Sequence, residues 1–168
     1  GGDVIDQNPA YNYKQLFDWI IDSRPNPNPP GTVYDYSNVN FVFAGRIIEK
    51  ITGKTYINYI KEDIMAPIGG TQTDISGKTE AEQKPNEVKY YGQGNDAPFV
   101  YTIAFPRRDA DGGLMTTASD LIRLVNAIDG SSTRPDILNS ASLTQLTTPS
   151  AAFNGYACGI GLWSAENI

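Results

Sequence analysis

The sequence has no histidine and only one cysteine among its 168 residues. A Ser-His-Asp triad and a Cys-His pair both require histidine, so neither can be built from this chain alone. Zinc sites are made mostly of histidine and cysteine, and one cysteine does not supply an ordinary zinc site. Any catalytic group in the chain must therefore be a serine, threonine, tyrosine, lysine or carboxylate, and we expect no metal and no cofactor.

The single cysteine, Cys158, lies in the segment GYACGIGLW near the end of the chain. One cysteine cannot form an internal disulfide. Its neighbours are small or apolar, and the segment has the composition of a β-strand. We therefore predict a terminal strand in which Cys158 is a small buried side chain.

The chain also lacks a long hydrophobic run and an excess of positive charge. No apolar segment reaches about 18 residues, so the sequence predicts no membrane-spanning helix. The first residues lack the basic-then-apolar pattern of a signal peptide, so we expect any export signal to lie outside this chain. The 13 Lys and Arg against 19 Asp and Glu give a formal net charge of −6. This balance argues against binding to nucleic acid or to an anionic membrane surface.

Apolar residues recur at helical spacing in several segments, which predicts a mainly helical chain. The ends of these segments carry typical boundary residues: Gly53 and Gly130 as C-terminal caps, Pro67 as a stop, and Thr117 with Asp120 as a capping box. The predicted helices cover residues 12–23, 39–52, 56–65, 116–130 and, capped by Ser140, 141–146.

Residues 66–113 differ from the rest because they are rich in Gly, Pro, Asn and Asp. We predict long loops there, with short strands at residues 87–91 and 98–103. Helices outnumber strands and no βαβ alternation appears, which argues against a doubly wound sheet. The predicted fold class is therefore mainly α with small β elements (α+β), in a single domain.

Phosphate and calcium motifs fail when they are checked position by position. TGKT and SGKT resemble the end of a phosphate loop, but Ile48 and Gln72 stand where the loop requires glycine. DADGG resembles the start of a calcium loop, but its sixth position is Leu114 rather than glycine. We reject all three motifs.

The residues Tyr36-Ser37-Asn38 stand just before the helix predicted over 39–52 and have two interpretations. In the structural one, Ser37 or Asn38 caps the helix, which stabilises it by about 0.5–2 kcal/mol, and Tyr36 packs beneath it. In the functional one, the positive field of the helix N-terminus and a nearby lysine make the Tyr36 hydroxyl easier to ionise. The apolar stripe of the helix predicted over 39–52 consists of Val39, Val42, Phe43, Ile47 and Ile51.

Several short motifs occur in an order that resembles the penicillin-recognising serine hydrolases. That family includes the class C β-lactamases, D-alanyl-D-alanine carboxypeptidases and related esterases. The segment GGLMTTASDLIRLVNAI resembles a later helix of the family, and YACGIGLW resembles its Tyr-Gly-x-Gly-x-Trp strand, with Ala157-Cys158 where one glycine is commoner. The shorter matching elements are Pro30-Gly31, Tyr36-Ser37-Asn38, Thr52-Gly53, Pro67-Ile68-Gly69 and Thr73.

The resemblance implies a fold and a chemistry. It implies the helical domain of the β-lactamase/transpeptidase-like fold and an acyl-serine intermediate formed on an amide, β-lactam or ester. Tyr36 would be the catalytic acid–base residue, which takes a proton from the serine nucleophile and returns it to the leaving nitrogen. Asn38 would bind the substrate amide through its donor and acceptor. The resemblance to this family also implies a periplasmic, secreted or cell-envelope location.

Two family motifs are missing from the sequence. No serine is followed three residues later by lysine, so the Ser-x-x-Lys nucleophile motif is absent, and neither Lys-Thr-Gly nor His-x-Gly occurs. We expect residues 1–168 to be a single helical-domain segment whose flanking α/β sheet domain is missing at both ends. The chain alone should then be inactive.

Other interpretations stay open. A non-catalytic binding module derived from the family would recognise a peptidoglycan peptide or a protein partner. The chain would otherwise associate with a separate sheet domain, or with itself through an exposed terminal strand. Gly112 and Gly113 either allow a close approach of the backbone in the site or simply satisfy the geometry of their loop. The aromatic residues that either line a substrate cleft or simply pack are Tyr90, Tyr91, Tyr101 and Phe105.

Overall fold

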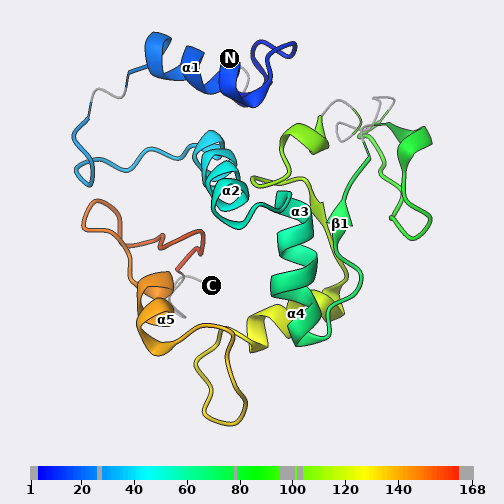
Figure 1. Cartoon of the computed structure of the whole chain (residues 1–168), viewed down its shortest axis with the longest axis vertical. Helices are drawn as coiled ribbons and strands as arrows, with labels where there is room; N and C mark the ends of the chain where they lie inside the picture. The colour runs from blue at the N-terminus through cyan, green and yellow to red at the C-terminus, as the bar shows by residue number, and fades with distance from the viewer. Residues whose placement is uncertain (1–3, 26–27, 78, 95–100, 102–103, 163–168) are drawn as a thin grey trace. The chain divides into compact units, whose positions relative to one another are not determined.

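The structure is a computed structural model that describes residues 4–25, 28–77, 79–94, 101 and 104–162 (Figure 1). The described chain is mostly helical and contains a small two-stranded sheet, as the sequence predicted. Its elements, in chain order, are η1 (Val4–Asp6), α1 (Tyr13–Ser23), α2 (Asn38–Thr52), α3 (Tyr56–Tyr59), η2 (Ile60–Met65), η3 (Ala66–Ile68), β1 (Asp74–Ile75), η4 (Glu80–Glu82), η6 (Phe105–Arg107), β2 (Leu114–Met115), α4 (Ala118–Asn126) and α5 (Ser140–Thr147).

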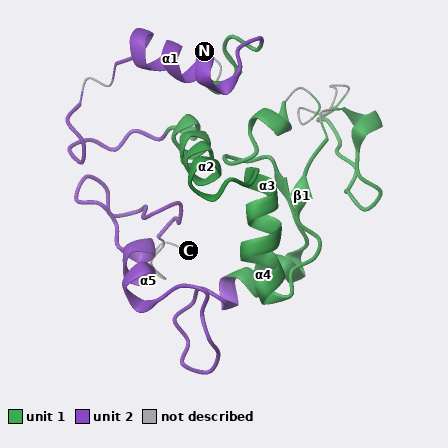
Figure 2. Ribbon diagram, in the orientation of Figure 1, with its two compact units in different colours: residues 1–9, 37–124 green, residues 10–36, 125–168 purple. Residues whose placement is uncertain are grey.

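The chain divides into two compact units (Figure 2). Unit 1 comprises Gly1–Pro9 and Ser37–Leu124, and unit 2 comprises Ala10–Tyr36 and Val125–Ile168. Each unit therefore combines an early and a late stretch of the sequence. The buried apolar side chains are Ile5, Val39, Val42 and Met65 in unit 1, and Leu16, Ala127 and Ala157 in unit 2.

Helix α1 begins at Tyr13, one residue after the predicted start, because Asn12 is its N-cap and closes a full capping box. The Asn12 Oδ1 accepts the backbone N–H of Gln15 at 2.9 Å, and Gln15 Oε1 accepts the backbone N–H of Asn12 at 3.0 Å. Two N–H groups that lack a partner within the helix are thereby satisfied. Leu16, one residue further on, is fully buried and fixes the inward face of the helix.

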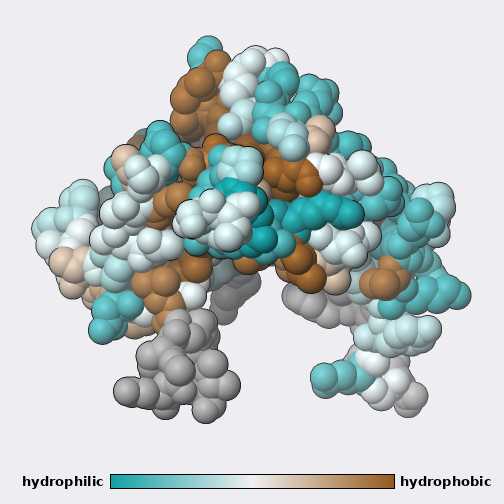
Figure 3. All heavy atoms as spheres, turned by 90° about the horizontal axis from the view of Figure 1, so that it is seen from below, coloured by the Kyte–Doolittle hydropathy of each residue, from teal (hydrophilic) through white to brown (hydrophobic). Residues whose placement is uncertain are grey.

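Helix α2 begins one residue before the predicted start and ends at Thr52 as predicted, and Gly53 follows it in the left-handed conformation with φ 71°. Its predicted stripe is only half correct. Val39 and Val42 are buried, whereas Ile47 is 56% exposed and Ile51 is 79% exposed. Periodicity identifies the apolar face of a helix but not the length of that face which a neighbour covers. Apolar side chains at the surface are visible as brown spheres on the face drawn in Figure 3.

The third predicted helix continues further than expected. It begins as α3 at Tyr56, widens into the π-helical η2, and then tightens into the 3₁₀ turn η3. The prediction that Pro67 stops it is wrong. Pro67 lies in the first turn of η3, where no backbone donor is needed, and Gly69 ends the turn with φ 76°.

Strands β1 and β2 pair antiparallel, with Asp74 opposite Met115 and Ile75 opposite Leu114. Neither strand was predicted. The strand expected at residues 87–91 is wrong, because that stretch is irregular and Gln83 Nε2 donates to the backbone carbonyl of Val88 at 2.5 Å. The strand expected at 98–103 lies almost entirely outside the described residues.

The boundaries of the last two helices differ from the prediction by a few residues. The hydroxyl of Thr117 accepts the backbone N–H of Asp120 at 3.1 Å, so the predicted N-terminal cap of α4 is present. Helix α4 ends at Asn126, before Gly130. Helix α5 is capped by Asn139 rather than Ser140, because Asn139 Oδ1 accepts the backbone N–H of Ser142 at 2.9 Å.

The terminal segment is a tight hairpin instead of a continuous strand. Tyr156 forms an antiparallel bridge with Gly161, and the chain reverses at Gly159, whose φ is 84°. Cys158 lies at this reversal and is exposed, so the prediction of a buried cysteine is wrong. A residue at the tip of a turn has few neighbours to cover it, whatever its hydrophobicity.

Candidate functional site

Tyr36, the predicted acid–base residue, is the last residue of the first stretch of unit 2 before the chain enters unit 1. Its side chain is 58% exposed. This exposure contradicts the interpretation in which Tyr36 packs beneath the following helix. A hydroxyl that must exchange a proton with a substrate has to be reachable, and an exposed side chain is compatible with that requirement.

Asn38, the predicted substrate-binding residue, is the first residue of α2 and is half-buried. Ser37 occupies the N-cap position with extended backbone angles (φ −146°, ψ 112°), but its side chain makes no capping hydrogen bond. The expected side-chain cap from Ser37 is therefore not formed. Helix α2 runs from Asn38 to Thr52, long enough for its N-terminus to carry the partial positive charge of a helix dipole.

The Tyr-x-Asn motif spans the boundary between the two units. Tyr36 belongs to unit 2, and Ser37 and Asn38 belong to unit 1. The chain itself keeps the two predicted site residues two positions apart.

In unit 2, Tyr36 belongs to a cluster of aromatic side chains, which we call the aromatic cluster and define as Tyr34, Tyr36, Phe153 and Tyr156. The rings of Tyr36 and Tyr156 meet edge to face, with centroids 6.3 Å apart and an interplanar angle of 76°. Tyr34 lies 6.1 Å from Tyr156 and 4.4 Å from Phe153. Burial, and then the neighbouring hydroxyls of Tyr36 and Tyr34, raise the pKa of Tyr156.

Sequence reasoning missed this cluster. Tyr34 precedes Tyr36 by two residues, which was a local signal that the two side chains could share a side. Phe153 and Tyr156 are more than a hundred residues away along the sequence. The resemblance pointed to the segment that contains Tyr156, but not to its contact with Tyr36.

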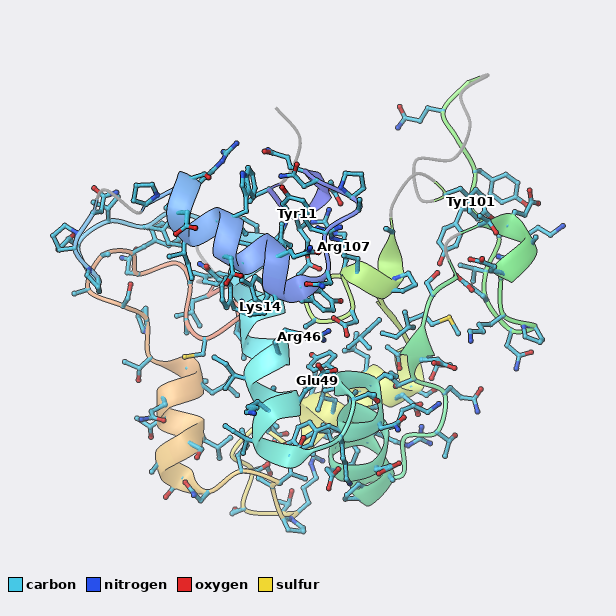
Figure 4. The ribbon with its side chains drawn as sticks, turned by 45° about the horizontal axis from the view of Figure 1, so that its top comes forward. Tyr11, Lys14, Arg46, Glu49, Tyr101 and Arg107 are labelled. Carbon is cyan, nitrogen blue, oxygen red and sulfur yellow. The ribbon has the colours of Figure 1, made fainter. Side chains whose placement is uncertain are left out.

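In unit 1, charged side chains tie the loop before β2 to α2. Arg46 Nη2 donates to Asp109 Oδ2 at 2.5 Å and Arg46 Nε lies 3.3 Å from Glu49 Oε2. Figure 4 labels Arg46 and Glu49 on α2. Burial raises the pKa of Asp109, and the Arg46 guanidinium opposes that change. Tyr56 lies nearby; burial and the charge of Asp109 raise its pKa, and its backbone N–H donates to Glu49 Oε1 at 2.8 Å.

The Gly-Gly pair of this loop is held through its backbone. The N–H groups of Gly112 and Gly113 both donate to the carbonyl of Arg108, at 3.1 and 2.8 Å. The carbonyl of Gly113 accepts the N–H of Ser76 at 3.1 Å, next to β1. A Cβ added at Gly112 would meet nothing within 4 Å among the described residues, so packing does not require glycine there.

Asp120 takes a role that the capping box did not predict. Its carboxylate is almost fully buried and accepts the backbone N–H groups of Gln72 at 2.7 Å and Thr71 at 3.0 Å, as well as Arg123 Nη1 at 2.6 Å. The N–H of Gln72 contributes most to lowering the pKa of Asp120. The carboxylate thus joins α4 to the segment before β1.

The tyrosines proposed to line a cleft divide into two groups. Tyr90 donates its hydroxyl to Glu87 at 2.9 Å and meets Tyr101 edge to face at 5.7 Å, whereas Tyr91 is 83% exposed. The side chain of Phe105 lies outside the described part of the structure. A cavity of about 400 Å³ is lined by Gln72, Asn86, Glu87, Val88, Tyr90, Leu114, Met115, Thr116 and Thr117.

This cavity and a second one of about 450 Å³ both lie in unit 1, and neither is lined by Asn38. The described residues contain no group of three or more acidic, histidine or cysteine side chains that could hold a metal ion. Within the same described residues, no helix has both the length and the apolar character needed to cross a bilayer.

Comparison with known proteins places the chain in a family. The family model of the beta-lactamases matches residues 2–164. A penicillin-binding protein of Bacillus subtilis (strain 168) is 25% identical over 153 residues, which are 82% of this chain and 32% of that protein. A D-aminopeptidase of Cereibacter sphaeroides is 28% identical over 137 residues, 78% of this chain and 23% of that protein.

A solved structure supports the same fold. The crystal structure of a penicillin binding protein from Bacillus halodurans matches with a TM-score of 0.66 and 22% identity, over 89% of this chain and 46% of that one. The chain therefore spans less than half the length of each of these three relatives. Because the family model matches nearly the whole sequence, the chain belongs to the beta-lactamase family.

Proposed function

We propose that the chain is the helical-domain segment of a serine hydrolase that acts through an acyl-serine intermediate on an amide, a β-lactam or an ester. The family match supports the class of enzyme. The names of the relatives, a penicillin-binding protein and a D-aminopeptidase, support substrates of the penicillin and D-amino-acid type. A periplasmic, secreted or cell-envelope location follows from the same proposal.

The observation that carries the proposal is the exposed Tyr36 immediately before the N-terminus of α2. In this role Tyr36 removes the proton of the serine nucleophile and returns it to the leaving group, work that typically contributes about 10²–10⁴ in rate. Asn38, at the first position of α2, holds the substrate amide through its carbonyl and amino groups.

The nucleophile itself has to come from residues outside this sequence. No Ser-x-x-Lys occurs here, and the chain spans less than half of its relatives. We therefore assign the nucleophile, its lysine and the strand beside the oxyanion hole to an α/β sheet domain that this chain complements. The chain alone is then inert.

The test uses the product of the complete reading frame together with the chain of residues 1–168. Fluorophosphonate and a fluorescent penicillin should label the former at the serine of a Ser-x-x-Lys motif and leave the latter unlabelled. Replacing that serine by alanine is the control and should abolish labelling. Covalent labelling of a serine within residues 1–168 would contradict the proposal.

The missing motifs favour a second candidate function, a non-catalytic binding module. Such a module would bind a peptidoglycan peptide or a protein partner without forming a covalent adduct. A complete reading frame without Ser-x-x-Lys, whose product binds peptidoglycan peptides but is not labelled by either reagent, would support the module over the enzyme.

A further inference from the structure

We propose that Tyr156 is a positioning residue that holds the ring of Tyr36 in the orientation used for proton transfer. This inference rests on the acid–base role proposed above for Tyr36. It assigns no new chemical step. It assigns a cause for the direction in which the Tyr36 hydroxyl points.

The first observation is that Tyr36 has little to orient it. Its side chain is 58% exposed, and its ring meets the ring of Tyr156 edge to face at 6.3 Å and 76°. These values lie within the range that aromatic pairs prefer, in which the positive edge of one ring faces the negative face of the other. The contact therefore selects one ring orientation out of those open to an exposed side chain.

The second observation is that the backbone around Tyr156 is fixed. Tyr156 forms a bridge with Gly161, and the N–H of Leu162 donates to the carbonyl of Gly155 at 2.9 Å. On the other side, the N–H of Ala157 donates to the carbonyl of Ile160 at 2.9 Å. The hairpin thus holds Tyr156 from both directions, so its ring can act as a reference for Tyr36.

The third observation is a second layer of rings behind the contact. Tyr34 meets Tyr156 at 6.1 Å and 62°, and it packs on Phe153 at 4.4 Å. A Cβ built at Gly155 would lie 2.8 Å from Phe153 Cζ, so the Phe153 ring occupies the space that only glycine leaves open. The segment around Gly155 is therefore shaped to keep the aromatic cluster together.

The two tyrosines that meet have different roles in this arrangement. Burial and the neighbouring hydroxyls raise the pKa of Tyr156. In this arrangement Tyr156 supplies a ring that positions Tyr36, and the proton transfer is assigned to Tyr36. Because a misplacement of about 1 Å can cost about 100-fold in rate, an oriented ring matters for proton transfer.

The first experiment measures the contact in the chain of residues 1–168 by NMR. With the tyrosine rings assigned, Tyr36 and Tyr156 ring protons should show mutual NOEs. Tyr156→Phe should leave the Tyr36 ring resonances in place, and Tyr156→Leu should shift them. Tyr91→Leu, at an exposed tyrosine, is the matched control and should change nothing at Tyr36. Unchanged Tyr36 resonances in Tyr156→Leu would overturn the inference.

The second experiment measures steady-state hydrolysis by the product of the complete reading frame. Tyr156→Leu should lower kcat by about 10- to 100-fold and narrow or shift the pH profile, with KM nearly unchanged. Tyr156→Phe should restore wild-type rates because it keeps the ring. Equal losses in both variants, or no loss in Tyr156→Leu while Tyr36→Phe is inactive, would refute the positioning role.

Two further arms keep the outcomes separate. If the wild-type product of the complete reading frame hydrolyses no substrate and is labelled by neither reagent, the proposed function fails. The NMR result alone then decides whether Tyr156 orients Tyr36. If Tyr156→Leu does not fold, Gly155→Ala replaces it, since the added methyl displaces Phe153 and leaves both tyrosines in the chain. It should shift the Tyr36 ring resonances and lower kcat, and the absence of both effects would overturn the inference.

Discussion

At the scale of single residues, the candidate acid–base residue Tyr36 is exposed, and its ring meets the ring of Tyr156 edge to face. The Tyr-x-Asn pattern and its neighbours named Tyr36 and Asn38, and the structure shows that Tyr36 is exposed and that Asn38 starts α2. The partners of a residue are harder to predict, because they depend on which distant segments meet. The contact of Tyr36 with Tyr156 is an example, since no local pattern links the two.

Asp120 shows the same limit, and it leads to a prediction about pH. Its carboxylate accepts two backbone N–H groups and an arginine N–H, and these lower its pKa in the folded state. A lowered folded pKa contributes stability that is present above the unfolded pKa, about 3.9, and is lost as the pH falls through the folded pKa.

We therefore expect Asp120→Asn to lower the melting temperature most at neutral pH. The gap to the wild type should shrink as the pH is lowered through the range below about 4. Thermal unfolding followed by circular dichroism from pH 7 to pH 2 measures this. Asp35→Asn, which removes an exposed carboxylate, controls for the loss of one negative charge. Melting curves of Asp120→Asn that match the wild type at every pH would show that the buried carboxylate does not stabilise the fold.

At the scale of elements, periodicity and caps located the helices, and packing decided the rest. The helices α1 and α2 occur close to the predicted residues because apolar periodicity and the Gly53 cap are strong local signals. The exposed Ile51 and the helical turn through Pro67 were not predictable, since they depend on what lies next to each element. The two-residue strands β1 and β2 are too short to leave a pattern in the sequence.

The contact between α2 and the loop before β2 yields a prediction at this scale. A Cβ added at Gly45 would lie 2.6 Å from the Cβ of Ala110, which is too close for two carbon atoms. Gly45→Ala gains about 1 kcal/mol of helix propensity but creates overpacking that costs about 1–3 kcal/mol. We expect a net loss of about 1 kcal/mol in the free energy of unfolding.

The matched control is the double variant Gly45→Ala/Ala110→Gly, which removes the opposing methyl group. It should recover most of the stability lost in Gly45→Ala. Urea unfolding of the wild type and of the three variants, including Ala110→Gly alone, measures the coupling between the two sites. Additive effects of the two substitutions would mean that helix and loop do not touch at this point.

At the scale of the whole molecule, the sequence predicted one mainly helical domain, and the structure divides into two compact units. Composition sets the size of the core that a chain can build, but it does not show how that core is divided. The early residues of the chain illustrate this, because η1 belongs to unit 1 while α1, only a few residues later, belongs to unit 2.

Unit 2 has a small core, to which α1 contributes the fully buried side chain of Leu16. We expect Leu16→Ala to lower the free energy of unfolding by about 2–5 kcal/mol, as deletion of buried methyl groups generally does. Ile21→Ala on the same helix is the control, since Ile21 is 65% exposed and its loss should stay within about 0.5 kcal/mol. Urea unfolding followed by circular dichroism measures both, and equal losses would show that Leu16 does not hold the helix in place.

The pairing of β1 with β2 has a consequence for how freely the protein can vary. Thr73 and Thr116 join their hydroxyls at 2.9 Å, and Ser76 donates its N–H to the carbonyl of Gly113, so the two ends of the intervening segment are fixed together. Lengthening a flexible loop whose ends are already joined costs only about 0.6 kcal/mol per doubling. An insertion next to Tyr91, which is 83% exposed, should therefore cost little closure entropy, and a new binding loop could be grafted there while α2 and α4 stay in place.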